Sequence, residues 1–138
     1  MAKTTANFRA LRELCGITQQ QAADACGVRV LTVKRWERGD APVPDDAMAW
    51  LMECVAEHDR GVANELGEIM ANLPEGAEVC LTYYRTQEQA DAEAYHEQAG
   101  PHGFLNAVTR STAEHLVAMG YRVSFSYPDE ERIYDGEI

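Results

Sequence analysis

Residues 17–39, which read ITQQQAADACGVRVLTVKRWERG, constrain the fold of this chain more than any other segment. Thr18 and Gln21 have the spacing of a capping box, which predicts a helix that starts beside Thr18. Gly27 can supply the positive φ that a tight turn often needs. A second short helix is then expected over 30–38, so the segment predicts two helices joined by a short corner.

The second of these helices combines an apolar side with strong positive charge. Val33 and Trp36 lie three residues apart and are expected to face inward, and Gly39 is expected to end the helix. Four cations lie on the helix or at its start: Arg29, Lys34, Arg35 and Arg38. A helix-turn-helix of this kind places its second helix in the DNA major groove, so the segment predicts double-stranded DNA as a partner.

The charge of the 138-residue chain is divided unevenly along its length. Residues 1–44 hold seven basic and four acidic side chains, a net charge of +3. Residues 45–138 hold five arginines and nineteen acidic side chains, a net charge of −14. DNA would repel such a chain as a whole, so we expect the basic part to face the DNA and the acidic part to lie away from it.

The composition excludes several other classes of protein. The chain is 46% hydrophobic and 25% charged, as soluble globular proteins are, and its apolar runs are too short for a membrane span. The N-terminus lacks the apolar core of a signal peptide, so a cytoplasmic location without a membrane partner is expected. The chain also lacks CxxC pairs, paired metal-ligand spacings and the common catalytic motifs, which predicts free thiols, no metal, no cofactor and no enzymatic activity.

The pattern changes to a long amphipathic helix at residue 45. Apolar residues repeat at alternating spacings of four and three from Met48 to Leu73, interrupted at Asp59. One helix over 45–73 would span about 44 Å, and a break near 59–61 is the alternative. The apolar seam is expected either to pair with a second copy of the chain or to be covered by the C-terminal segment.

The C-terminal segment predicts two strands separated by two helices. Alternating residues predict strands over 78–85 and 121–127, and helices are expected over 86–98 and 103–119, before an exposed acidic tail. Two strands alone are marginally stable in water, so we expect a second chain to complete or cover the sheet. The side chains expected at this dimer contact are Val62, Leu66, Ile69, Leu81, Tyr83, Val123 and Phe125.

These elements together predict an α+β chain with two domains. The first is an all-helical helix-turn-helix domain over 1–58, and its long helix can extend to residue 73. The second is a small strand–helix–helix–strand dimerisation domain over 59–138.

The stretch LRELCGITQQQAADACGV, followed by TVKRWERG, resembles the Cro/phage-repressor (XRE) helix-turn-helix family over about residues 8–51. Ala22 departs from the family pattern, which usually has leucine there. The stretch WERGDAPVPDD, the long helix and the C-terminal elements are similar to the YdiL-like regulators, a group that includes anti-CRISPR-associated repressors. The resemblance implies a lambda-repressor-like N-terminal bundle and a homodimer that represses its own operon.

The resemblance also implies which residues read the DNA sequence. Those directed toward base edges are Arg29, Val30, Leu31, Thr32 and Arg35. Arg35 is the first choice for specificity, because arginine bonded to guanine is the commonest direct base contact. Val30 and Leu31 replace polar residues of the family, so they would read thymine methyl groups or no base at all. Asp40 and Asp45 stand where relatives often carry basic residues, and they would weaken binding unless they serve only as caps.

Other residues have supporting roles in the resemblance. Gln19 would bond a phosphate and buttress the second helix, and Lys34 and Arg38 would contact phosphates. Arg12 and Glu37 match a family pair that forms a buried ion bridge.

Two alternative functions follow from the same features. The chain could be an antitoxin or adaptor whose acidic C-terminal domain binds a protein partner. It could also be a repressor that binds both operator DNA and a structured RNA leader through the same basic face.

Overall fold

The computed structural model of the chain describes residues 6–93 and 100–130. The chain divides into two compact units, residues 1–58 and 59–138. None of the helices within the described ranges is long and apolar enough to cross a membrane. Two predicted features lie outside the described residues: the end of the helix predicted over 86–98, and most of the acidic tail.

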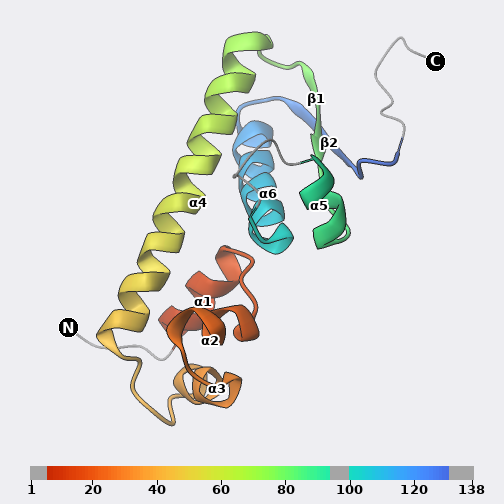
Figure 1. The fold of residues 1–138 in the computed structure, drawn as a ribbon. Coiled ribbons are helices and arrows are strands. Elements are labelled where there is room, and N and C mark those ends of the chain that lie inside the picture. The colour runs from red at the N-terminus through yellow and green to blue at the C-terminus, as the bar shows by residue number, and fades with distance from the viewer. Residues whose placement is uncertain (1–5, 94–99, 131–138) are drawn as a thin grey trace. The chain divides into compact units, whose positions relative to one another are not determined.

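Over its described residues, 6–58, the first unit is built only from helices (Figure 1). They are α1, Ala6–Leu14; α2, Gln19–Cys26; α3, Val30–Arg38; and the first part of α4, Asp45–Asn72. The N-terminal part of the chain is thus a helix-turn-helix, as predicted. Together with the two strands of the second unit, it gives the predicted α+β fold.

The turns of the first unit form where the sequence signals predicted them. The Thr18 hydroxyl accepts a hydrogen bond from the Gln21 backbone N–H at 3.0 Å, and the Gln21 side chain accepts one from the Thr18 N–H at 2.9 Å. This confirms the capping box at the start of α2. Gly27 ends α2 with a φ of 68°, and Gly39 ends α3 with a φ of 80°, a left-handed conformation that favours glycine.

Aromatic and small side chains share the core of the first unit. The rings of Phe8 on α1 and Trp36 on α3 meet edge to face, with centroids 5.4 Å apart. Ala22 and Ala23 of α2 are fully buried, as is Leu51 of α4. Because the alanines are small, neighbouring helices can approach α2 closely.

The long helix α4 is continuous, so the alternative of a break near 59–61 is not realised. Its residues up to His58 belong to the first unit, and those from Asp59 onward belong to the second. In the second unit, Val62 is buried, and Leu66 and Ile69 pack against the core formed by the C-terminal segment. This part of the apolar seam is covered within the chain.

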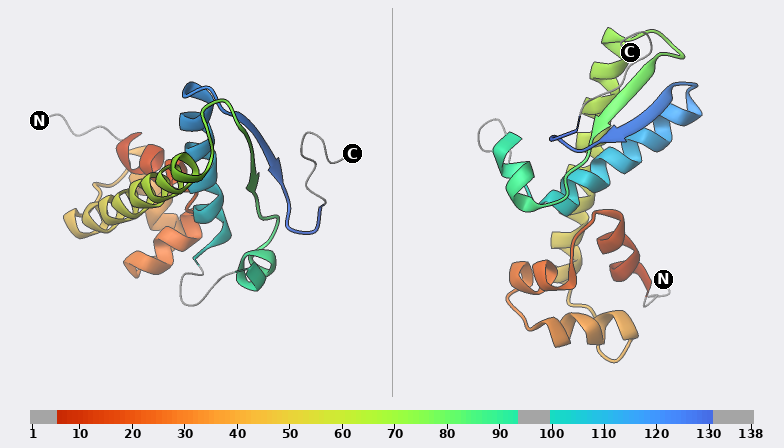
Figure 2. Two further views of the ribbon diagram at one scale, coloured as in Figure 1. Left: turned by 90° about the horizontal axis from the view of Figure 1, so that it is seen from above. Right: turned by 90° about the vertical axis from the view of Figure 1, so that its right-hand side faces the viewer.

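Two parallel strands form the sheet of the second unit. The elements after α4 are β1, Glu78–Thr82; α5, Gln87–Glu93; α6, His102–Ala118; and β2, Arg122–Ser126. β1 and β2 run side by side in the same direction (Figure 2). Leu81 of β1 lies opposite Phe125 of β2. Parallel strands need a long crossover connection, and here α5 and α6 lie within it.

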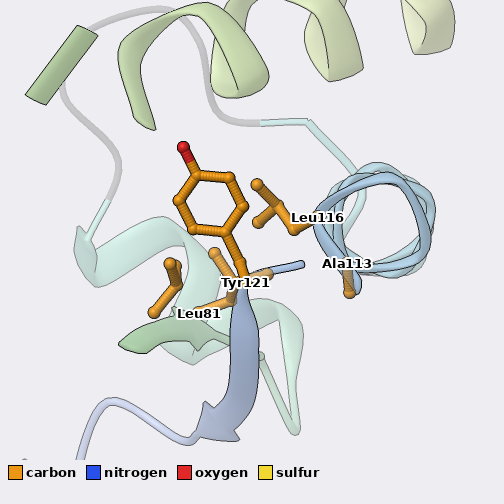
Figure 3. Packing of buried hydrophobic residues seen from close by; sticks show 5 residues of the cluster. Leu81, Ala113, Leu116 and Tyr121 are labelled. Carbon is orange, nitrogen blue, oxygen red and sulfur yellow. The ribbon is translucent and has the colours of Figure 1, made fainter. Parts of the chain in front are cut away.

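One face of the sheet packs against α6. Figure 3 shows Leu81 and Tyr121 meeting Ala113 and Leu116 of that helix. The Tyr121 hydroxyl donates a hydrogen bond to the backbone carbonyl of Leu73 at 3.3 Å, which also ties the end of α4 to this core.

The residues predicted at a dimer contact fall into two groups in the structure. Four lie in this core or pack against it, namely Leu66, Ile69, Leu81 and Val123, and a fifth, Val62, is also buried. They are therefore used within the subunit. Phe125 is 50% exposed, so it is the member of the set that another chain can reach most easily, and Tyr83 is half-buried.

Candidate nucleic-acid interface

The orientation of α3 is set by its buried side. Val33 and Trp36 are at most 4% exposed, so one side of the helix is held against the unit. The four predicted cations are all exposed to solvent: Arg29, Lys34, Arg35 and Arg38. The helix therefore presents a positively charged face to solvent.

A buried ion pair fixes α3 relative to α1. Arg12 Nε donates to Glu37 Oε2 at 2.7 Å, and Arg12 Nη2 donates to Glu37 Oε1 at 2.9 Å. The two side chains are only 10% and 4% exposed. Arg12 Nη1 also donates to the backbone carbonyl of Ile17 at 2.8 Å, a contact that the sequence analysis missed. One guanidinium thus joins α1, α3 and the segment that precedes α2.

Gln19 adds a third helix to this network. Its Nε2 donates to Glu37 Oε1 at 3.1 Å, so the start of α2 buttresses α3 through the same carboxylate. Burial by itself would raise the pKa of Glu37, but the hydrogen bonds from Arg12 and Gln19, with the nearby positive charge of Arg12 and Arg9, hold that pKa below its ordinary value. Glu37 is therefore ionised at neutral pH and accepts all three side-chain hydrogen bonds.

The side chains predicted to read bases differ in their accessibility. Arg35 is exposed, and Leu31, at the start of α3, is 47% exposed. Val30 and Thr32 are half-buried. Arg29 is the N-cap residue of α3, but its side chain makes no capping hydrogen bond.

The exposed cations of α3 have different neighbours. Arg38 Nε donates to Asp40 Oδ2 at 3.1 Å, in an ion pair whose side chains are both 58% exposed. Lys34 and Arg35, in contrast, form no ion pair with any residue in the described part of the chain. Asp45 lies in the first turn of α4, where the helix dipole favours a carboxylate. Of these two aspartates, Asp40 is thus the one that pairs with a cation predicted to contact phosphate, Arg38.

The second unit has a depression of about 370 Å³ that the sequence did not predict. Arg110 Nη1 donates to the Tyr83 hydroxyl at 2.5 Å, and the rings of Tyr83 and Phe125 meet edge to face with centroids 5.9 Å apart. These residues are far apart in the sequence, so no local pattern could indicate the contact. The lining residues are Tyr83, Arg110, Phe125, Ser126, Tyr127 and Glu130.

Comparison with known proteins gives one result for the first unit. Residues 8–55 match the sequence model of the helix-turn-helix family. The matched segment contains most of α1, all of α2 and α3, and the first turns of α4, and so it contains both the buried ion pair and the cationic face. No curated protein matches the chain.

Proposed function

We propose, on the premise that residues 8–55 are a helix-turn-helix domain of the Cro/phage-repressor (XRE) type, that this chain is a transcriptional regulator that represses its own operon. Two subunits would each place α3 in the major groove of one half of a palindromic operator. The centres of the two half-sites would then lie about 34–36 Å apart, or a multiple of this distance.

The observation that carries the proposal is the pair of accessible cations on α3. Lys34 and Arg35 are exposed and form no ion pair among the described residues, while Val33 on the same helix is buried. An arginine in the major groove can bond both acceptors of guanine, and a lysine can neutralise a phosphate. We therefore assign base reading to Arg35 and phosphate binding to Lys34.

The uneven charge supports this assignment. The basic residues of 1–44 are carried on a chain whose remaining residues have a net charge of −14. Repulsion between this acidic part and DNA disfavours any approach other than one led by the basic face. The affinity for DNA should therefore fall steeply as the salt concentration rises.

We assign dimerisation to residues 59–138. The sheet has two strands in the described part of this range, and such small sheets gain stability when another element covers them. Phe125 of β2 is 50% exposed and its ring meets that of Tyr83, so a second copy could bury this aromatic pair. Light scattering should then show a dimer, and Phe125→Asp should give monomers.

A gel-shift experiment with the promoter of the chain's own operon tests the proposed function. Arg35→Ala should weaken binding by about 1–3 kcal/mol and relax the preference at one base position. Lys34→Ala should weaken all DNA sequences alike and reduce the salt slope by about 0.9. Arg60→Ala is the matched control, because it removes an exposed cation from the second unit and leaves α3 unchanged. Unchanged binding by both α3 variants would exclude α3 as the DNA-contacting element.

A second candidate function is that of an antitoxin or adaptor. The aromatic depression around Tyr83 and Phe125 favours it, because such a surface could hold apolar side chains of a protein partner. A protein that co-purifies with the unaltered chain, but not with Phe125→Asp, would support this alternative. Competition between promoter DNA and its transcript would test whether the same cationic face also binds an RNA leader.

A further inference from the structure

One apolar side chain interrupts the charged face of α3. Leu31 is 47% exposed, and it lies on the side of the helix that is turned away from the buried residue Val33. At 3.6 residues per turn, Arg35 follows Leu31 by about 40° around the helix and about 6 Å along it. Leu31 and Arg35 therefore share one accessible stripe, and Arg38 continues this stripe one turn later.

The neighbours of Leu31 leave it as the most accessible apolar group at the start of α3. Val30 and Thr32 are both half-buried, and the side chain of Arg29 precedes the helix. The N-terminal residues of a recognition helix are those that contact base edges. A leucine in that position has no hydrogen-bonding group, so it can add to recognition only through apolar contact.

The major groove offers one apolar group for such a contact. Guanine, cytosine and adenine present only hydrogen-bond donors and acceptors there, whereas thymine presents its C5-methyl group. We propose that Leu31 is a specificity-determining residue that selects thymine by packing against this methyl group. This inference rests on the proposed function, because it requires α3 to enter the major groove.

A uracil scan provides the test. The full-length chain is first used to select duplexes from a random DNA library, and the affinity for the selected duplex is measured. Each thymine is then replaced in turn by uracil, which removes only the methyl group. One replacement per half-site should weaken binding by about fourfold, the effect expected for one buried methyl group. Binding by Leu31→Ala should be insensitive to the same replacement.

Two further variants separate a specific contact from a general effect. Leu14→Ala is the matched control, because Leu14 on α1 is 46% exposed and loses the same atoms. It should keep the full sensitivity to uracil. Leu31→Met should also keep it, since methionine retains an apolar side chain of similar volume.

The outcomes distinguish this inference from the function on which it rests. If no DNA duplex is selected, the proposed function fails. If a duplex is selected but no uracil replacement weakens binding of the unaltered chain, DNA binding stands and the role of Leu31 is refuted. Equal uracil sensitivity in Leu31→Ala would refute that role as well.

Discussion

The buried pair of Arg12 and Glu37 leads to the sharpest prediction for this molecule. Arg12→Met keeps an unbranched aliphatic side chain but removes the guanidinium and the three hydrogen bonds that it donates. Glu37, whose side chain is 4% exposed, would then remain as a buried carboxylate with only Gln19 as a side-chain donor. The variant should therefore lose much more than the energy of one hydrogen bond.

The expected loss is large compared with the stability of the unit. Removal of one member of a buried ion pair costs about 3–5 kcal/mol, because the remaining charge is left without compensation. Small domains have about 0.05–0.15 kcal/mol of stability per residue, or about 3–9 kcal/mol for residues 1–58. Arg12→Met should therefore remove at least about a third of the stability of the first unit.

Tryptophan fluorescence during urea unfolding can measure this loss in the first unit alone. Both tryptophans of the chain, Trp36 and Trp50, lie in residues 1–58, so their emission reports the unfolding of the first unit. The double variant Arg12→Met with Glu37→Leu should recover part of the lost stability, because it leaves no unpaired buried charge.

Arg9→Met provides the control on the same helix. Arg9 forms an exposed pair with Glu13 at 3.4 Å, with side chains 63% and 56% exposed. Such surface pairs contribute about 0–1 kcal/mol. If Arg12→Met loses no more stability than Arg9→Met, or if the double variant is no more stable than Arg12→Met, the argument from buried charge is refuted.

Three further predictions concern DNA affinity, acid stability and the glycine turn. Asp40→Asn removes the acidic partner of Arg38, so it should strengthen promoter binding and steepen the salt slope by about 0.9 in gel shifts at several salt concentrations; weaker binding would contradict the proposed phosphate contact. The pKa of Glu37 is lowered from 4.5, so its stabilising contribution is present above this pH and is lost as the pH falls through the lower value in the folded state. Acid titrations of tryptophan emission should therefore show the stability of the unaltered chain and of Glu37→Gln converging below pH 4.5, and a gap that widened in acid would exclude this assignment. Gly27→Ala should destabilise the first unit by about 1–2 kcal/mol through backbone strain, because the φ of Gly27 is 68° and the added Cβ would meet nothing within 4 Å. Gly67→Ala on α4 is the control, because its Cβ would also meet nothing within 4 Å but its φ is not positive. Unfolding followed by circular dichroism should show no loss of stability for this control.

Local signals were sufficient to place the helices of the first unit. The bonds of the Thr18 capping box join residues three apart, and the left-handed φ of Gly27 and Gly39 depends on the absence of a Cβ at each position. Such effects act within a few residues, so the predicted range 30–38 coincides with α3. The inward side of that helix was equally predictable, because Val33 and Trp36 have the spacing of one helical face.

The arrangement of the second unit needed contacts between distant residues. The apolar seam predicted that Leu66 and Ile69 would be covered. Because the hydrophobic effect is non-directional, the pattern could not predict which segment covers them. The C-terminal segment of the same chain covers them in the structure. The same reason explains why no sequence pattern indicated the contact of Arg110 with Tyr83, because it joins residues 27 positions apart in the chain.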